Sequence, residues 1–267
     1  MAFIDIEKTL KSKNSGFARA IPNFVISYIK KVVHQDDLND IIFTAKDKQG
    51  FDFIRHSLDY MNISYGVEGI ENVPREGRFV FAANHPLGGL DGLILTLEVG
   101  KIFPNVKFPV NDLLLNVTAL KDLFLPINKH GRQAKEAAKL VEDAYASEDQ
   151  ILYFPAGLCS RKKRGEIIDL EWKKNFITKA IKHKRDIIPV HFTGKNSNFF
   201  YNLANVRKSL GVKSNFEMVY LPDEMFKQEG KSLTMTFGKP ISYLEIKESG
   251  LSAQEWSDQI KKLVYQL

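Results

Sequence analysis

Short apolar runs alternate with longer amphipathic segments along most of the chain. Eight runs are typical of strands, each bounded by glycine, proline, asparagine or charge: 64–69, 78–83, 106–110, 124–127, 150–154, 187–192, 216–221 and 233–237. Between them, apolar positions recur at helical spacing over 91–99, 132–146, 170–183, 199–210 and 253–265. This alternation predicts an α/β fold with a mainly parallel central sheet flanked by helices.

The N-terminal part of the chain has a different pattern. Residues 17–60 show helical spacing in two or three pieces, separated near 35–37 and 48–50, before any strong strand pattern begins. We therefore predict an N-terminal helical membrane-association segment, 1–62, and an α/β domain, 63–267. Within the first, residues 17–33 mix apolar side chains with Arg19, Lys30 and Lys31, and Pro22 starts or breaks a helix. Such a helix suits a membrane surface or the protein's own core, and both interpretations stay open.

Composition restricts the class of protein. The chain has 267 residues, of which 44% are hydrophobic and 26% charged, as in a folded globular protein. A single cysteine, Cys159, excludes an intramolecular disulfide and a cysteine-based zinc cluster, and it fits a reducing compartment. No run reaches the roughly 20 apolar residues that a membrane-spanning helix needs, and the first 13 residues lack the apolar core of a secretory signal. We expect a cytoplasmic protein.

The formal net charge of +6 is concentrated in one stretch. Residues 160–185 contain ten lysines or arginines and three acidic residues. Such a run is commonly the solvated face of a helix, but Arg161 to Arg164 directly follow a predicted strand end, where basic side chains can meet an anionic group. Neither zinc-finger spacing nor an aromatic RNA-binding signature accompanies the run, so we expect no nucleic-acid partner.

The loop of residues 84–92 contains the strongest candidates for catalytic residues. It follows the apolar run 79–83 and holds His85 and Asp91 among three glycines. A carboxylate can fix one imidazole nitrogen, which leaves the other nitrogen free to take a proton from a hydroxyl nucleophile. The simpler alternatives are that Asp91 caps the helix that follows and that His85 is a satisfied polar residue.

Three more loops lie at predicted strand ends. The loops are 125–132, which is basic and opens a helix, 152–161, which turns from apolar to basic, and 187–194. Helix N-termini and cationic side chains favour anions, and proline and glycine in 152–161 allow close approach of the backbone. Because parallel strands end at one edge of a sheet, these loops are the expected neighbours of His85.

The four loops, taken in order, resemble the blocks of the glycerolipid (lysophospholipid) acyltransferase superfamily. The resemblance covers roughly residues 64–240, and the blocks are Asn84-His85 through Asp91, then Pro126 to Arg132, then Phe154-Pro155-Ala156-Gly157 with Ser160 and Arg161, and finally Ile188-Pro189-Val190. It implies O-acylation by general-base catalysis, with His85 as the base and Asp91 holding its ring.

The resemblance also implies substrates and partners. The acyl donor is acyl-carrier protein or acyl-CoA, the acceptor is a lyso-lipid, and neither a metal nor a further cofactor is required. The candidate substrate-binding residues are Asn84, Lys129, Arg132, Gly157, Ser160, Arg161 and Arg164. We expect the protein to bind an anionic membrane surface. Its expected location is the inner face of the cell membrane, as a peripheral protein.

Two departures from the usual blocks bear on the acceptor. Five residues separate His85 from Asp91 where the family usually has four, and Ala156 replaces the usual glutamate of the third block. The longer loop is similar to that of a subgroup often labelled hemolysin-like, which includes acyltransferases of amino-acid lipids. The acceptor therefore stays open between lysophosphatidic acid and an N-acyl amino-acid lipid. The alternative of another class is a non-catalytic lipid-binding or membrane-perturbing protein.

Three other chemistries receive less support from the sequence. Cys159 lies near a possible base, but lone intracellular cysteines are more often small buried hydrophobes. His85, His130 and His191 with Asp91 match no zinc spacing. A lipase needs a Gly-x-Ser-x-Gly elbow, and the chain has none.

Overall fold

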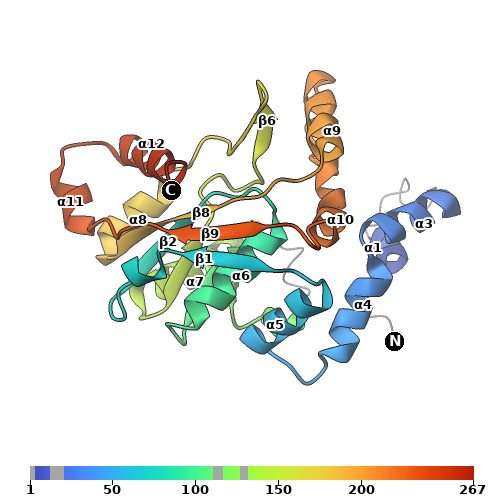
Figure 1. Ribbon diagram of the computed structural model, residues 1–267, viewed down its shortest axis with the longest axis horizontal. Coiled ribbons are helices and arrows are strands. Elements are labelled where there is room, and N and C mark those ends of the chain that lie inside the picture. Colours follow the sequence, from blue (N-terminus) through green and yellow to red (C-terminus); the bar gives the residue numbers. More distant parts are fainter. Residues whose placement is uncertain (1–3, 13–20, 111–116, 127–131) are drawn as a thin grey trace.

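A seven-stranded sheet forms the centre of the protein (Figure 1). The computed structural model describes residues 4–12, 21–110, 117–126 and 132–267. The strand order is β1-β9-β8-β2-β5-β3-β4, and every neighbouring pair is parallel except the antiparallel pair β8 and β9. The strands are β1 Tyr65–Glu68, β2 Phe79–Ala83, β3 Val106–Val110, β4 Phe124–Pro126, β5 Gln150–Tyr153, β8 Asp186–Phe192 and β9 Leu233–Phe237. The predicted α/β class with a mainly parallel sheet is confirmed.

Helices cover both faces of this sheet (Figure 1). The helices are α1 Ile6–Ser12, α3 Asn23–Val32, α4 Gln35–Thr44, α5 Gly50–Tyr60, α6 Gly89–Gly100, α7 Arg132–Ala146, α8 Asn175–His183, α9 Asn198–Ser209, α10 Leu221–Phe226, α11 Tyr243–Glu248 and α12 Ala253–Val264. Short 3₁₀ helices are η1 Ile70–Asn72, η3 Thr118–Leu120 and η4 Phe216–Tyr220. None of the helices in the described ranges is long and apolar enough to cross a membrane.

The two-residue period of β2 divides the core into two layers. Phe79, Phe81 and Ala83 point to one face, where α4, α5 and α6 contribute their apolar side chains. Val80 and Ala82 point to the other face, which α7, α8, α11 and α12 cover. All five strand residues are buried, as expected for a central parallel strand with helices on both sides.

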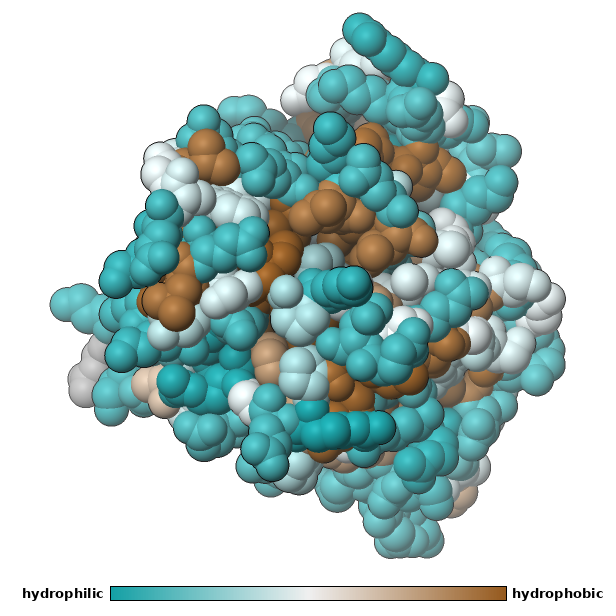
Figure 2. All heavy atoms as spheres, turned by 60° about the vertical axis from the view of Figure 1, so that its left-hand side comes forward, coloured by the Kyte–Doolittle hydropathy of each residue, from teal (hydrophilic) through white to brown (hydrophobic). Residues whose placement is uncertain are grey.

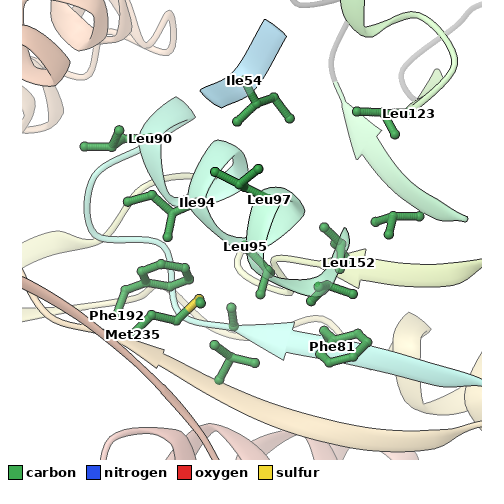
Figure 3. Close-up of a cluster of buried hydrophobic side chains, with 14 of the residues drawn as sticks. Ile54, Phe81, Leu90, Ile94, Leu95, Leu97, Leu123, Leu152, Phe192 and Met235 are labelled. Atoms are coloured by element: carbon green, nitrogen blue, oxygen red, sulfur yellow. The ribbon is translucent and has the colours of Figure 1, made fainter. Parts of the chain in front are cut away.

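Helix α6 is the apolar centre of the first layer. Figure 3 shows Leu95 pointing from α6 toward the sheet and Leu97 pointing toward Ile54 of α5. Because α6 is wrapped by neighbours on nearly every side, its first turn is fixed at the carboxyl end of β2. Part of the predicted N-terminal segment therefore packs on the domain core through α4 and α5.

The predicted strand 216–221 is wrong. This stretch forms η4 and the start of α10 instead, and Pro222 occupies the first turn of α10, followed by Asp223 and Glu224. Proline and acidic residues both favour the first turn of a helix. A six-residue apolar run alone does not distinguish a strand from a helix.

The basic stretch after β5 forms a hairpin that the sequence pattern did not predict. It consists of β6 Arg161–Lys163 and β7 Glu166–Ile168, which pair antiparallel. The turn residues Arg164 and Gly165 have φ of 51° and 91°, the left-handed region that tight hairpin turns require. The predicted helix 170–183 consequently starts later, at Asn175, because the chain reaches the core first through buried Trp172.

Candidate active site

Three loops meet at the carboxyl ends of neighbouring parallel strands. The loop of His85 follows β2, the central strand of the three, and the loops that begin at Phe154 and Thr193 follow β5 and β8. The backbone N–H of Ser160 donates to the carbonyl oxygen of His85 at 2.8 Å, so the first two loops are directly joined. The edge of the sheet thus brings together three of the four predicted blocks.

His85 and Asp91 form a hydrogen-bonded dyad. Nδ1 of His85 lies 3.1 Å from Oδ2 of Asp91. That carboxylate oxygen also accepts the backbone N–H groups of Leu87 at 2.8 Å and Gly88 at 3.1 Å. Because the carboxylate can only accept, Nδ1 carries the proton and Nε2 keeps its lone pair. No described residue hydrogen-bonds Nε2, and the His85 side chain is 16% exposed.

Asp91 is both a helix-start residue and the partner of His85. It occupies the third position of α6, where the positive end of the helix favours a carboxylate. Its side chain is fully buried, and Oδ1 has no hydrogen-bond partner in the described ranges. Burial raises the pKa of Asp91, while the hydrogen bond from His85 opposes that rise. A poorly solvated carboxylate of this kind is a strong partner for an imidazolium.

Gly88 makes the tight turn of this loop possible. Its φ of 79° lies in the region that side chains rarely adopt. A Cβ at this position would lie 3.1 Å from a methyl carbon of Leu221 and 3.2 Å from Sγ of Cys159. The glycine therefore lets the backbone N–H groups turn inward to Asp91 without displacing α10 or the third block.

The aromatic ring of Phe154 supports the histidine from one side. The rings of His85 and Phe154 are stacked, with centroids 4.2 Å apart and planes 24° apart, and Phe108 meets the edge of Phe154. This stacking fixes the plane of the imidazole in addition to the bond from Asp91. The third block thus helps to orient the proposed base.

Asn84 joins the loop to the neighbouring strand. Its Oδ1 accepts the N–H of Phe192 at 2.6 Å, and its Nδ2 donates to the carbonyl oxygen of Phe192 at 2.9 Å. Asn84 is only 2% exposed. In this structure, its side chain therefore connects the ends of β2 and β8.

Arg161 lies beside a fully buried glutamate. One of its terminal nitrogens lies 3.0 Å from Oε1 of Glu217, and Nε of Arg207 lies 2.8 Å from Oε2 of the same residue. The guanidinium of Arg161 also stands over the ring of Phe200 and donates to the carbonyl oxygen of Cys159. Two arginines and one glutamate leave one net positive charge at this position.

The remaining predicted substrate-binding residues lie in different surroundings. Ser160 is buried, and Gly157 turns the third block with a φ of 67° while its N–H donates to the carbonyl oxygen of Phe154. Arg164 is exposed at the tip of the β6–β7 hairpin. Lys129 lies outside the described residues. Arg132 begins α7, and its side chain also lies outside the described part.

Cys159 is a buried apolar residue in this structure. It is 0% exposed, and burial raises the pKa of its thiol to about 12. A thiol with this pKa supplies almost no thiolate near neutral pH. Among the described residues, no group of histidine, cysteine and carboxylate side chains is arranged to hold a metal ion, and His130 lies outside them.

Asp169 is a site residue that the sequence did not reveal. Its Oδ1 accepts the backbone N–H of His85 at 3.2 Å and the hydroxyl of Ser160 at 2.6 Å, and its Oδ2 accepts Nε1 of Trp172 at 2.8 Å. Tyr265 of the C-terminal region bonds the backbone N–H of Asp169 at 2.7 Å. Asp169 therefore connects the loop of His85 with Ser160 of the third block through its hydrogen bonds to both.

Replacing Asp169 with asparagine should reduce kcat about tenfold with little change in KM, because a small displacement of the base weakens catalysis more than substrate binding. The amide retains the size of the carboxylate but replaces one acceptor oxygen with a donor. Steady-state kinetics below the unfolding temperature of the variant would measure the effect.

Asp186→Asn is a matched control, because Asp186 accepts a backbone N–H from Tyr243 at the opposite edge of the sheet. Equal losses of kcat in the two variants, or a KM that rises instead, would contradict a positioning role for Asp169.

Comparison with known proteins identifies the class. The sequence profile of the family described as Acyltransferase matches residues 8–267. The chain belongs to this family, and it is an acyltransferase, as the four blocks predicted. The fold is similar to that of the 1-acyl-sn-glycerophosphate acyltransferase PlsC from Thermotoga maritima, with a TM-score of 0.51, 16% identity, and coverage of 91% of this chain and 90% of that chain.

Two curated relatives are much more similar in sequence. A lyso-glycine lipid O-acyltransferase from Bacteroides thetaiotaomicron is 51% identical over 265 residues, which are 99% of this chain and 97% of the relative. A protein of the same name from Phocaeicola vulgatus is 48% identical over 265 residues, covering 99% and 95%. Both relatives are named as enzymes, so the non-catalytic alternative has no support.

Proposed function

We propose that the protein transfers a fatty acyl group from acyl-carrier protein or acyl-CoA to the hydroxyl of a lyso-glycine lipid. This acceptor is proposed because two lyso-glycine lipid O-acyltransferases are similar to the protein along 99% of its chain. The enzyme works as a peripheral protein on the inner face of the cell membrane, where a lipid acceptor is found.

The dyad supplies the proton transfer. Nε2 of His85 takes the proton of the acceptor hydroxyl as its oxygen attacks the thioester carbonyl carbon, and Asp91 stabilises the imidazolium that forms. The attack forms the C–O bond of the tetrahedral intermediate, which then collapses to the ester by breaking its C–S bond. The departing thiolate then receives the proton back from Nε2. The step needs no acyl-enzyme, which agrees with the buried thiol of Cys159.

Arg161 is the proposed contact for the anionic end of the acceptor. Its two terminal nitrogens donate to Glu217, to the carbonyl oxygens of Cys159 and Ser160 and, weakly, to Met218 Sδ, and of the five N–H donors only that of Nε has no acceptor among the described residues. The net single positive charge of Arg161, Arg207 and Glu217 matches the single negative charge of a glycine carboxylate. A phosphate monoester carries about −1.5 to −2 at neutral pH and needs more positive charge than this group provides.

Acceptor choice is the direct test of the proposed function. Purified enzyme is incubated with labelled acyl-CoA or acyl-carrier protein and three acceptors: a hydroxyl-bearing N-acyl glycine, its ornithine analogue and lysophosphatidic acid. We expect ester formation on the glycine acceptor at least about tenfold faster than on lysophosphatidic acid, because the wrong head group leaves charges unmatched. Acylation of lysophosphatidic acid alone would overturn the proposal.

A further inference from the structure

Helix α9 carries a second apolar stripe that no part of the described chain covers. Phe200, Tyr201 and Ala204 face the protein and are buried. On another face, Phe199, Val206 and Leu210 are 50%, 56% and 73% exposed. Their spacings of seven and four residues place them in one line along the helix, about 16 Å long at 1.5 Å per residue.

Two neighbouring elements, η4 and α3, also expose apolar side chains. Phe216 of η4 is exposed, and so are Phe24 and Tyr28 of α3, which lie one turn apart. The hydroxyls of Tyr28 and Tyr220 are 3.1 Å apart, and the rings of Tyr220 and Phe199 are in contact. We name this set the α3–α9 surface; its members are Phe24, Tyr28, Phe199, Val206, Leu210 and Phe216.

This concentration of apolar side chains differs from the scatter on an ordinary protein surface. Of the sixteen exposed large hydrophobic residues in the described ranges, eight lie in α3, α9, η4 and the turn between α9 and η4. Figure 1 shows α9 standing away from the sheet, with α3 on the same side of the molecule. Figure 2 brings forward a different side of the molecule, the left-hand side of Figure 1 with α11 and α12, and there brown hydrophobic atoms lie between hydrophilic ones. Contiguous exposed apolar patches mark interaction sites.

The charged side chains of α9 and of the turn between α9 and η4 are all basic. Between residues 195 and 219 there are four basic residues, Lys195, Arg207, Lys208 and Lys213, and the single acid of this stretch, Glu217, is fully buried. Helix α3 adds the exposed Lys31, whereas its Lys30 pairs with Glu7 of α1 at 3.1 Å. Just after α3, the acids Asp37 and Asp223 lie beside His34, so the basic rim is on the α9 side of the surface. An apolar face with a basic rim fits the interface of an anionic bilayer, into which the apolar side chains insert while lysines meet lipid head groups.

We propose that the α3–α9 surface docks on an anionic lipid bilayer, with α9 and η4 as contact elements in addition to the N-terminal helix. This inference rests on the proposed function for the identity of the partner. The surface is also connected to the dyad: Glu217 of η4 pairs with Arg161, and Leu221 of α10, which follows η4 directly, lies against Gly88. A bilayer on this face supplies the lipid acceptor next to the site.

Vesicle co-sedimentation tests the docking surface on the full-length protein. The double variant Val206→Gln/Leu210→Gln should bind phosphatidylglycerol-containing vesicles at least about tenfold more weakly than the wild type, because two apolar side chains no longer leave water. The variant Lys208→Gln/Lys213→Gln should lose about tenfold or more on these vesicles and little on pure phosphatidylcholine vesicles.

Matched controls use residues of the same types on another part of the molecule. Leu244 and Leu251 are 45% and 39% exposed, and Lys239 and Lys247 are exposed as well. Leu244→Gln/Leu251→Gln and Lys239→Gln/Lys247→Gln should bind vesicles like the wild type. Equal losses in the controls, or wild-type binding by both α9 variants, would overturn the docking surface.

A second measurement separates this inference from the proposed function. With a short-chain N-acyl glycine acceptor below its micelle concentration, the α9 variants should retain wild-type turnover, and they should lose it only on vesicle-bound acceptor. If neither the wild type nor any variant transfers an acyl group, the proposed function is contradicted. The vesicle-binding data would still show whether the α3–α9 surface docks on a bilayer. A dimer in sedimentation velocity that Val206→Gln/Leu210→Gln abolishes, with vesicle binding unchanged, would assign the surface to a second copy of the chain and overturn the proposal.

Discussion

Replacing His85 with alanine is expected to reduce acyl transfer by a factor of about 10² to 10⁴, the usual contribution of a positioned general base. The loss should appear in kcat, because in the proposed mechanism Nε2 takes its proton during the reaction and is not needed to bind either substrate. The rate is measured with labelled acyl donor and the glycine acceptor at saturation. The variant should keep the fold, because His85 contributes one stacked ring and one side-chain hydrogen bond to the loop.

His56→Ala is a suitable control for this experiment. His56 lies on α5, bonds the hydroxyl of Thr44 and takes no part in the dyad. Its replacement should leave kcat within about twofold of the wild type. If the His85→Ala enzyme retains a tenth or more of the wild-type kcat while remaining folded, His85 is not the base.

Replacing Arg185 with methionine should lower the free energy of unfolding by about 3–5 kcal/mol, because it removes a buried cation from its partners. Arg185 is 0% exposed, and its guanidinium donates to carbonyl oxygens of five residues. These are Tyr145 at 2.7 Å, Asp149 at 2.6 Å, Ser147 at 2.5 Å, Ala144 at 3.1 Å and Phe79 at 3.5 Å. Methionine fills most of the volume but leaves these buried acceptors unpaired.

The measured quantity is the midpoint of thermal unfolding, which should fall by about 6–20 °C for a protein of this size. Lys184→Met is the matched control: it removes the same charge from the adjacent, exposed residue and should move the midpoint by only a few degrees. A midpoint unchanged in Arg185→Met would show that the carbonyl groups at the end of α7 find other partners.

The dyad was predictable from sequence because its signals are local. A buried strand followed by a glycine-rich loop with His85 and Asp91 brings both residues to one turn, six positions apart. The parallel order of β2, β5 and β8 then explains why Phe154 and Ser160 meet that turn. The order of the four blocks indicated the family and its chemistry, whereas the periodicity of apolar residues indicated only the fold class.

Other features depended on contacts between distant residues. Asp169 reaches His85 across 84 positions and Tyr265 across 96, so nothing next to it in the sequence marked its role. The basic stretch 160–185 also contains both buried and exposed cations, and composition alone does not tell them apart. Arg185 is fully buried at its end, whereas Lys163 and Arg164 are exposed on the β6–β7 hairpin.

The errors in secondary structure had other causes. The run 216–221 is apolar and short, which also fits a strand, but the proline and the two acidic residues that follow it favour a helix. The hairpin turn at Arg164 and Gly165 uses Arg in a left-handed conformation, which the usual Asn-Gly or Asp-Gly signal does not cover.

The backbone amides of Leu87 and Gly88 fix the carboxylate of Asp91 in the folded protein. The N–H groups of Leu87 and Gly88 already point at the carboxylate before any substrate is bound, and α6 keeps them there by burying most of its residues. In the proposed mechanism, the carboxylate that stabilises positive charge on His85 is therefore already held in position, whereas water would first have to turn. On this mechanism, folding of α6 would supply in advance the orientation of the carboxylate that the imidazolium needs.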